Sequence, residues 1–270
     1  MKYRVASVPY LNAKPLVKPI EWLGAESPVQ VGYRVPSQLP ALLESGEAEA
    51  IMVSSIYALS NPGLVVAAGL SISTRTKVES VRLFSRVPFR DITTVAWDAS
   101  SMTSNALTRI LLQELYGIWP EGERQPPVQR EMLKDYDACV MIGDKGMAGS
   151  SDGLYVMDLG EAWHDVTGLP FVWAMWVGRD DLSPELVAHL QWSHREAMAN
   201  LDRVIEEASD ETGFAPDQCR HYFAEIMDYG LSDKHLAGLT LFGEKASQLG
   251  IIDRPHPIQV VESAQPALAG

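Results

Sequence analysis

Small polar side chains recur where apolar segments of this sequence end, and these residues are suited to hold a small ligand. Asn12 lies in the turn PYLNAKP (residues 9–15), directly after the apolar segment 3–8. Its amide offers both a hydrogen-bond donor and an acceptor. Asparagine also caps helices. The residue is therefore a candidate site residue, with a plain helix cap as the alternative.

A run of hydroxyl side chains, DASSMTS at residues 98–104, precedes an amphipathic segment. Ser101, Thr103 and Ser104 belong to this run. The unpaired N–H groups and the positive dipole end of a helix N-terminus can hold a carboxylate or a phosphate. The glycine pattern of a P-loop is absent. The run predicts an anion-binding turn, with helix capping as the alternative.

Four further polar residues are weaker candidates. Ser54 and Ser55 follow the apolar segment 50–53, and Asp144 follows an apolar strand that ends in I-G-D. Asp144 could cap a short helix or face the ligand. Ser80 lies within the extended segment VESVRLFS, and a serine in a strand carries little functional signal by its type alone.

Other kinds of chemistry find little support in the sequence. The six histidines lie outside these turns, and Cys139 and Cys219 lack zinc-ligand spacing, so we interpret both as reduced structural thiols. The G-x-S-x-G and G-x-G-x-x-G patterns are also absent. We expect no metal and no cofactor.

Composition indicates a globular protein that binds neither nucleic acid nor an anionic membrane surface. Hydrophobic residues make up 46% of the chain, and the formal net charge is -13 without a basic stripe. An anionic ligand must therefore be held by local donors. Polar residues interrupt the N-terminal segment, so it lacks the apolar core of a signal peptide, and no stretch is long enough for a membrane span. We expect a cytoplasmic protein.

Strand and helix patterns alternate along the first two thirds of the chain. We expect a first series of strands at 3–8, 29–35, 50–53, 64–68 and 78–85, and a second series at 92–97, 137–142 and 171–177. A helix with apolar residues on one face follows at 105–116 and stops at Gly117. Asn12 is expected to open a helix that Pro19 breaks. Beyond Gly178 we expect one long helix to about Ala208, helices at 216–227 and 232–249, and a loose tail from Pro255.

This alternation predicts mainly parallel sheets flanked by helices, hence an α/β fold. The two series predict two lobes joined by two crossings. Residues 1–89 and 177–270 form the first lobe, including the C-terminal helices, and residues 90–176 form the second. Ligands of open α/β sheets bind beyond the carboxyl ends of the strands. The polar residues at those ends therefore predict a central cleft that binds a small anion.

Six segments resemble one enzyme family. They are PYLNAKPL, VPSQLPALLESGEAEA, SVRLFSRVP, SSMTSNALTRILL, ACVMIGD and DLGEAWHDVTGLPFVWAMW, and they occur in family order. The chain resembles the chorismate dehydratases (MqnA family) of the futalosine pathway of menaquinone biosynthesis. The resemblance implies a type II periplasmic-binding-protein-like fold with two lobes, a hinge and a helical C-terminal segment. One position departs from the family, because Met102 stands where an arginine is common.

The resemblance also implies a reaction, the loss of water from chorismate to give 3-[(1-carboxyvinyl)oxy]benzoate. It places Asn12 and Ser80 at the reacting face, where Ser80 would hydrogen-bond the leaving hydroxyl or hold the ring, and Asn12 would orient the enolpyruvyl group. Thr103 and Ser104 would bind one carboxylate, and the substrate's own carboxylate would accept the proton. Chorismate is the one partner implied, and the sequence does not predict an oligomeric state.

Three alternatives stay open. A solute-binding protein of the same fold would need an export signal, which is not visible in the sequence. The sister enzyme, 1,4-dihydroxy-6-naphthoate synthase, has a first turn of S-x-C-x-N-D character and uses a histidine, and this chain has neither feature at the matching place. A ligand-sensing domain would normally accompany a DNA-binding or signalling domain, for which we find no room.

Overall fold

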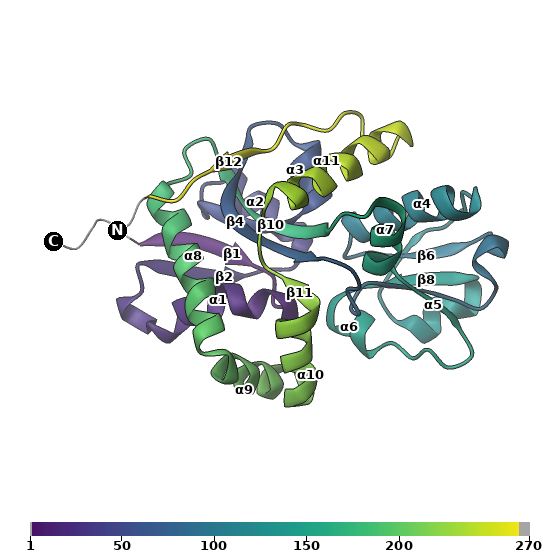
Figure 1. Ribbon diagram of the computed structural model, residues 1–270, viewed down its shortest axis with the longest axis horizontal. Coiled ribbons are helices and arrows are strands. Elements are labelled where there is room, and N and C mark those ends of the chain that lie inside the picture. Colours follow the sequence, from purple (N-terminus) through teal and green to yellow (C-terminus); the bar gives the residue numbers. More distant parts are fainter. Residues whose placement is uncertain (1, 265–270) are drawn as a thin grey trace.

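Two α/β lobes lie side by side in the computed structural model, which describes residues 2–264 (Figure 1). The first lobe contains a seven-stranded sheet in the order β11-β4-β10-β3-β1-β2, with β12 also paired to β4. Its strands are β1 (Tyr3–Ser7), β2 (Val29–Tyr33), β3 (Ala50–Ser54), β4 (Leu64–Thr74), β10 (Phe171–Arg179), β11 (Met227–Asp228) and β12 (Gln259–Val261).

The second lobe contains a five-stranded sheet in the order β7-β6-β8-β5-β9. Its strands are β5 (Arg82–Ser85), β6 (Val95–Asp98), β7 (Arg124–Gln125), β8 (Ala138–Met141) and β9 (Tyr155–Asp158). Figure 1 shows the chain leaving the first lobe after β4 and returning with β10. The two-lobed α/β fold predicted from the sequence is therefore confirmed.

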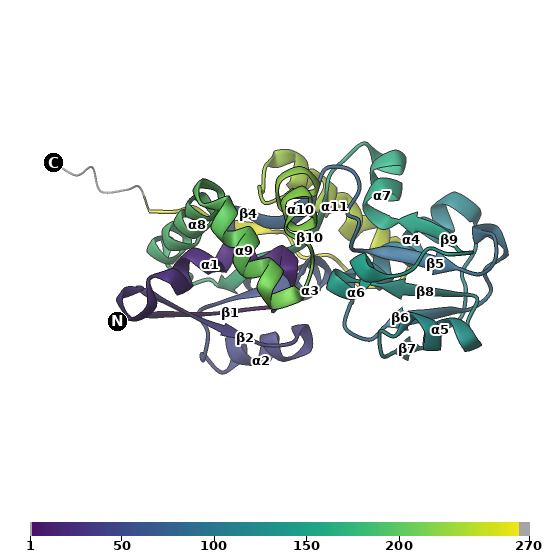
Figure 2. The ribbon, with the colours of Figure 1, turned by 90° about the horizontal axis from the view of Figure 1, so that it is seen from below.

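Helices flank both sheets, as Figure 2 shows from below. The first lobe carries α1 (Lys14–Trp22), α2 (Leu39–Glu44), α3 (Ser55–Ser60), α8 (Pro184–Ala199), α9 (Leu201–Thr212), α10 (Pro216–His221) and α11 (Asp233–Gln248). The second carries α4 (Thr103–Tyr116), α5 (Gln129–Asp135), α6 (Gly143–Ala148) and α7 (Leu159–Thr167). No helix within residues 2–264 combines the length and apolar character that a membrane crossing requires.

The expectation of mainly parallel sheets was only partly right. The β1–β2, β1–β3, β6–β8 and β6–β7 pairs are parallel. In contrast, β10 runs antiparallel between β3 and β4, and β5 runs antiparallel between β8 and β9. Both sheets are therefore mixed.

Two strands join a different sheet from the one expected. The strand Arg82–Ser85 belongs to the second sheet, and Phe171–Arg179 belongs to the first. Fully buried apolar strands carry no mark of the sheet that they will join. We accordingly propose that the lobes meet at residues 75–81 and 168–170 rather than at 89/90 and 176/177.

Three local expectations also need correction. Asn12 lies in a 3-10 turn (Leu11–Ala13) and makes no capping bond, and α1 continues through the buried Pro19. The long helix beyond Gly178 divides at Asn200, whose backbone is non-helical (φ -121°, ψ 40°). A one-residue break preserves the 3-4 spacing of apolar residues, so the sequence pattern hides it. The segment after Pro255 is not loose throughout, because β12 pairs in parallel with β4; residues 265–270 lie outside the described part.

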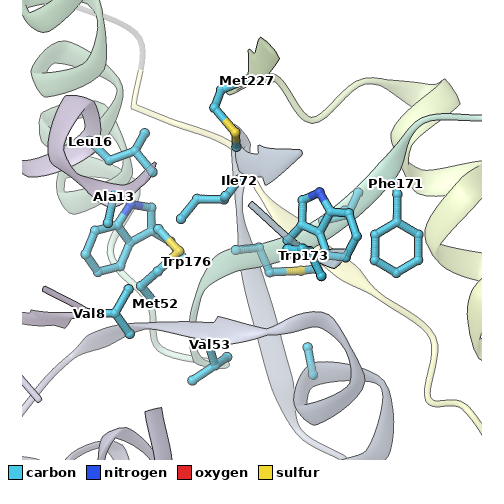
Figure 3. Close-up of a cluster of buried hydrophobic side chains, with 14 of the residues drawn as sticks. Val8, Ala13, Leu16, Met52, Val53, Ile72, Phe171, Trp173, Trp176 and Met227 are labelled. Carbon is cyan, nitrogen blue, oxygen red and sulfur yellow. The ribbon is translucent and has the colours of Figure 1, made fainter. Parts of the chain in front are cut away.

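Strand β10 organises the core of the first lobe. Its Trp176 is fully buried and lies opposite Met52 of β3 in the sheet register (Figure 3). Farther along β10, the Phe171 ring packs edge-on against Trp163 at 5.3 Å and Phe242 at 5.0 Å between centroids. Burial of each large side chain contributes roughly 1.5–3 kcal/mol. This packing fixes the position of β10 in the core of the first lobe.

Candidate functional site

A cavity of about 450 Å³ lies between the two lobes. Ligand pockets in proteins typically enclose about 300–1,000 Å³, so this cavity is large enough for a small organic molecule. The first lobe contributes residues of β3, β4, β10 and the turn after β1, and the second contributes the 99–104 turn. The lining of the cavity includes Val8, Tyr10, Asn12, Met52, Ser54, Ile72, Val78, Val81, Ser100, Ser101, Met102, Thr103, Ser104, Arg124 and Trp173.

The cavity brings together five of the eight residues predicted for the site, from both lobes: Asn12, Ser54, Ser101, Thr103 and Ser104. The remaining three, Ser55, Ser80 and Asp144, do not line it. Each of these three is instead hydrogen-bonded within the protein.

The hydroxyl run before α4 serves the helix and the lobe contact as well as the cavity. Ser101 Oγ accepts a hydrogen bond from the Ser104 N–H at 3.1 Å, so the predicted capping role is present. Thr103 Oγ1 accepts from the Ile56 N–H in the first lobe at 3.0 Å. Each hydroxyl hydrogen is still free to bond a ligand in the cavity.

Asp98, the first residue of the 98–104 run, is a buried acid. Its carboxylate accepts hydrogen bonds from Ser100, with a distance of 2.8 Å to the Ser100 nitrogen. Burial raises the pKa of the Asp98 carboxyl, and the bonds from Ser100 lower it in part. Because this acid is close to the cavity, charge on it would oppose an anionic ligand.

Asp144 joins the two lobes behind the cavity. Its carboxylate accepts a hydrogen bond from the Leu11 N–H at 3.1 Å. Burial raises the pKa of the Asp144 carboxyl, while the Leu11 bond and the charge of Lys14 lower it in part. Asp144 does not line the cavity, and it links α6 to the turn that carries Asn12. Its contact with the substrate stays a prediction.

Ser55 is fully buried, and its hydroxyl donates to the Val172 carbonyl of β10. This bond fastens the start of α3 to the central strand, which explains why Ser55 does not face the cavity. The neighbouring Ser54 keeps its place on the wall.

Ser80 lies in a bend before β5, not inside a strand as the sequence predicted. Its neighbours Val78 and Val81 line the cavity, while the Ser80 side chain is turned toward Tyr222. The Ser80 and Tyr222 hydroxyl oxygens are 2.7 Å apart. Glu79 before it adopts a left-handed backbone (φ 58°), which is unusual for a residue other than glycine.

Asp158 holds this bend in place. Its carboxylate accepts hydrogen bonds from the Val78 N–H at 3.0 Å and the Glu79 N–H at 2.7 Å, and it also caps α7. These bonds stabilise the strained Glu79 backbone from one side. The position of Ser80 is consequently determined by its surroundings rather than left to a flexible loop.

Four apolar side chains also line the cavity: Trp173, Met52, Ile72 and Val8. The indole N–H of Trp173 donates to Thr74 Oγ1 at 3.2 Å, which fixes the ring orientation. Apolar side chains of this kind can bury a flat ring, and the polar lining residues can bind its polar substituents.

Comparison with known proteins identifies the family. The sequence profile of the family described as menaquinone biosynthesis matches residues 3–248. The chain belongs to the menaquinone biosynthesis family. It is 31% identical over 255 residues to the chorismate dehydratase of Thermus thermophilus, a match that spans 87% of this chain and 92% of that protein.

Solved structures show the same fold at low identity. Protein AF1704 from Archaeoglobus fulgidus matches with a TM-score of 0.75 and 19% identity, over 93% of this chain and 98% of that one. The alkanesulfonate-binding protein SsuA from Xanthomonas axonopodis matches with a TM-score of 0.70 and 13% identity, over 97% and 98%. These similarities confirm the periplasmic-binding-protein-like fold for this member of the menaquinone biosynthesis family.

The charge that faces the cavity comes from a residue that the sequence analysis did not single out. Among the described residues that line it, Arg124 of β7 is the one charged side chain. Met102, the departure from the family pattern, lines the same cavity and is 47% exposed. An arginine in a two-residue strand between loops gives no recognisable motif, so only the folded arrangement reveals it.

Proposed function

We propose that this protein is a chorismate dehydratase. The observation that carries the proposal is the similarity to the Thermus thermophilus enzyme, which extends over most of both chains. The cavity supports it, because its lining combines apolar side chains with hydroxyl, amide and guanidinium groups, which suits a ring that bears carboxylates and a hydroxyl.

The reaction breaks the C3–H and C4–O bonds of chorismate. The electrons of the C3–H bond form the new C3–C4 double bond, and the C4 hydroxyl leaves as water with a proton. The ring becomes aromatic, which provides the driving force. The enzyme must therefore orient the substrate and stabilise developing charge, and it does not need a strong nucleophile.

Asn12 and Ser80 are the proposed catalytic residues. Asn12 lines the cavity and would orient the enolpyruvyl group. Ser80 lies between Val78 and Val81, which line the cavity, and its hydroxyl is proposed to donate to the leaving C4 hydroxyl. The substrate's own carboxylate would accept the C3 proton.

The hydroxyls of Ser54, Ser101, Thr103 and Ser104 are proposed to bind the carboxylates of the substrate, with Arg124 supplying the positive charge. We propose supporting roles for Ser55 and Asp144. The Ser55 side chain is hydrogen-bonded to the backbone of β10, and the Asp144 side chain to the backbone of the turn that carries Asn12. The cytoplasmic location and the absence of nucleic-acid and membrane partners stay predictions of the sequence.

The test is to incubate the purified protein with chorismate, without added metal or cofactor, and to follow the product by chromatography and mass spectrometry. We expect many turnovers to a product lighter by one water. Asn12→Ala and Ser80→Ala should retain the fold and lose most of this activity. Recovery of unchanged chorismate from the wild-type protein would contradict the proposal, and thermal stabilisation by chorismate in that case would support the alternative of a binding protein.

A further inference from the structure

Tyr222 is a buried tyrosine at the junction of the two lobes, outside the cavity lining. It opens a π-helical turn (Tyr222–Ile226) that directly follows α10 in the C-terminal helical segment. Figures 1 and 2 show the end of α10 close to α6 of the other lobe. Only 2% of the Tyr222 surface is exposed. Single π-turns are rare and are often associated with functional sites.

The Tyr222 hydroxyl contacts Ser80, one of the two proposed catalytic residues. Its oxygen lies 2.7 Å from Ser80 Oγ. Burial raises the pKa of Tyr222 far above its usual value, and hydrogen bonding with Ser80 lowers it in part. The phenol therefore keeps its proton at any physiological pH, and it acts as a hydrogen-bonding group rather than as an acid or a base.

Either hydroxyl could be the donor across the 2.7 Å between Ser80 Oγ and the Tyr222 oxygen. In our proposal Tyr222 donates its one hydrogen and Ser80 Oγ accepts it. Asn12 Oδ1 is buried and has no hydrogen-bond partner among the described residues.

With Tyr222 as the donor, the Ser80 hydroxyl hydrogen has no acceptor among residues 2–264 and is free to donate to a ligand. A leaving hydroxyl needs a donor to its oxygen, so this hydrogen complements the C4 hydroxyl of the substrate.

The backbone around Ser80 strengthens the case for a fixed donor. The Asp158 carboxylate accepts hydrogen bonds from the N–H groups of the two residues before Ser80. Helix α6 packs so closely against the Ser80 carbonyl that a Cβ at Gly146 would lie 2.1 Å from its oxygen. With the backbone fixed, the rotation of the Ser80 side chain is the freedom that remains. Tyr222 restricts that rotation.

We propose that Tyr222 is a positioning residue for the dehydration, whose hydroxyl orients the Ser80 side chain so that the Ser80 O–H donates to the leaving group. This inference rests on the proposed function. It differs from a purely structural role because the effect of Tyr222 passes through Ser80 and belongs to the chemical step.

The test compares chorismate kinetics of the wild type, Tyr222→Phe, Ser80→Ala and the double variant. Tyr222→Phe removes a single oxygen from a buried ring. We expect kcat to fall about tenfold or more, the effect of one hydrogen bond made in the transition state, with KM changed less than about threefold. In the Ser80→Ala background the same substitution should have little further effect on kcat, because the Ser80 hydroxyl that Tyr222 contacts is already absent.

Tyr229→Phe is the matched control. Tyr229 is also a buried tyrosine of the same segment, and its hydroxyl has no partner among the described residues, so kcat should stay at the wild-type value. If Tyr222→Phe does not fold, 3-fluorotyrosine at position 222 tests the same contact. Its stronger hydroxyl donor should change kcat without changing KM.

The outcomes separate this inference from the proposed function. A wild-type protein that does not convert chorismate overturns both. A wild type that converts chorismate, with a Tyr222→Phe variant of equal kcat, overturns only the role of Tyr222. Equal losses in the wild-type and Ser80→Ala backgrounds also overturn it, because they would show that Tyr222 acts independently of Ser80.

Discussion

The Asp144 carboxylate of the second lobe accepts a hydrogen bond from the Leu11 N–H of the first lobe, 133 residues earlier in the chain, at 3.1 Å. Leu11 immediately precedes Asn12. This single contact therefore couples the relative position of the lobes to the placement of a proposed catalytic side chain.

Loss of this contact should weaken substrate binding. In Asp144→Ala the Leu11 N–H has no partner, and a hydrogen bond of this kind contributes about 0.5–1.5 kcal/mol. We expect KM for chorismate to rise about three- to tenfold and the radius of gyration from X-ray scattering to increase in the absence of substrate. Asp144→Asn retains an acceptor oxygen and serves as the control. If both variants have the wild-type KM, the contact does not contribute to binding.

Removal of the charge at Arg124 should affect binding more than chemistry. Arg124 is exposed at the cavity edge, away from the proposed reacting groups, so Arg124→Gln should raise KM several-fold and leave kcat almost unchanged. The wild-type KM should also rise with ionic strength more steeply than that of the variant. Arg130→Gln, an exposed position on α5 outside the cavity, is the control. An unchanged KM in Arg124→Gln would show that the guanidinium does not contact the substrate.

Gly146→Ala should displace Ser80. The added Cβ would lie 2.1 Å from the Ser80 carbonyl oxygen and 2.8 Å from that of Met141, so the backbone must move. We expect a lower melting temperature and a loss of kcat. Gly32→Ala is the matched control, because the nearest atom to its Cβ is 3.8 Å away. A variant with wild-type kcat would show that the exact position of the Ser80 backbone is not important for turnover.

The Asp228 carboxyl should make the stability of the protein depend on pH in the acid range. Burial would raise the pKa of the Asp228 carboxyl, but the nearby His235 and hydrogen bonds from Arg75 and the Gly230 N–H outweigh it and hold the pKa well below its usual range. A depressed native pKa contributes stability above the unfolded value, about 3.9, and this contribution is lost as pH falls below it. We expect the melting temperature of the wild type to fall more steeply below about pH 4 than that of Asp228→Asn. Melting temperatures that fall in parallel with pH in the two proteins would contradict this prediction.

Local patterns in the sequence predicted the local parts of the site. The hydroxyl run at 100–104 was recognisable because a helix start has a characteristic sequence, and the cavity does contain Ser101, Thr103 and Ser104. Gly117 was expected to end the same helix, and it does so with a left-handed backbone (φ 68°). Both predictions depend only on neighbouring residues.

Contacts between distant segments could not be predicted in this way. Tyr222 looks like an ordinary core residue of a helix, and nothing in its sequence context indicates a partner at Ser80, 142 residues away. Asp144 looked equally suited to capping or to ligand binding, and its true partner is a backbone N–H of the other lobe. The sheet membership of β5 and β10 failed for the same reason, since buried strands of either sheet are similarly apolar.

The pairing of β4 with β10, β11 and β12 affects the order in which the two lobes can fold during synthesis. The second sheet has all its strands once residue 158 has emerged, whereas β4 must wait for partners that end with β12 at 259–261. Contiguous segments form contacts sooner than widely separated ones. The second lobe therefore can fold first, and the cavity, which needs walls from both lobes, is completed last.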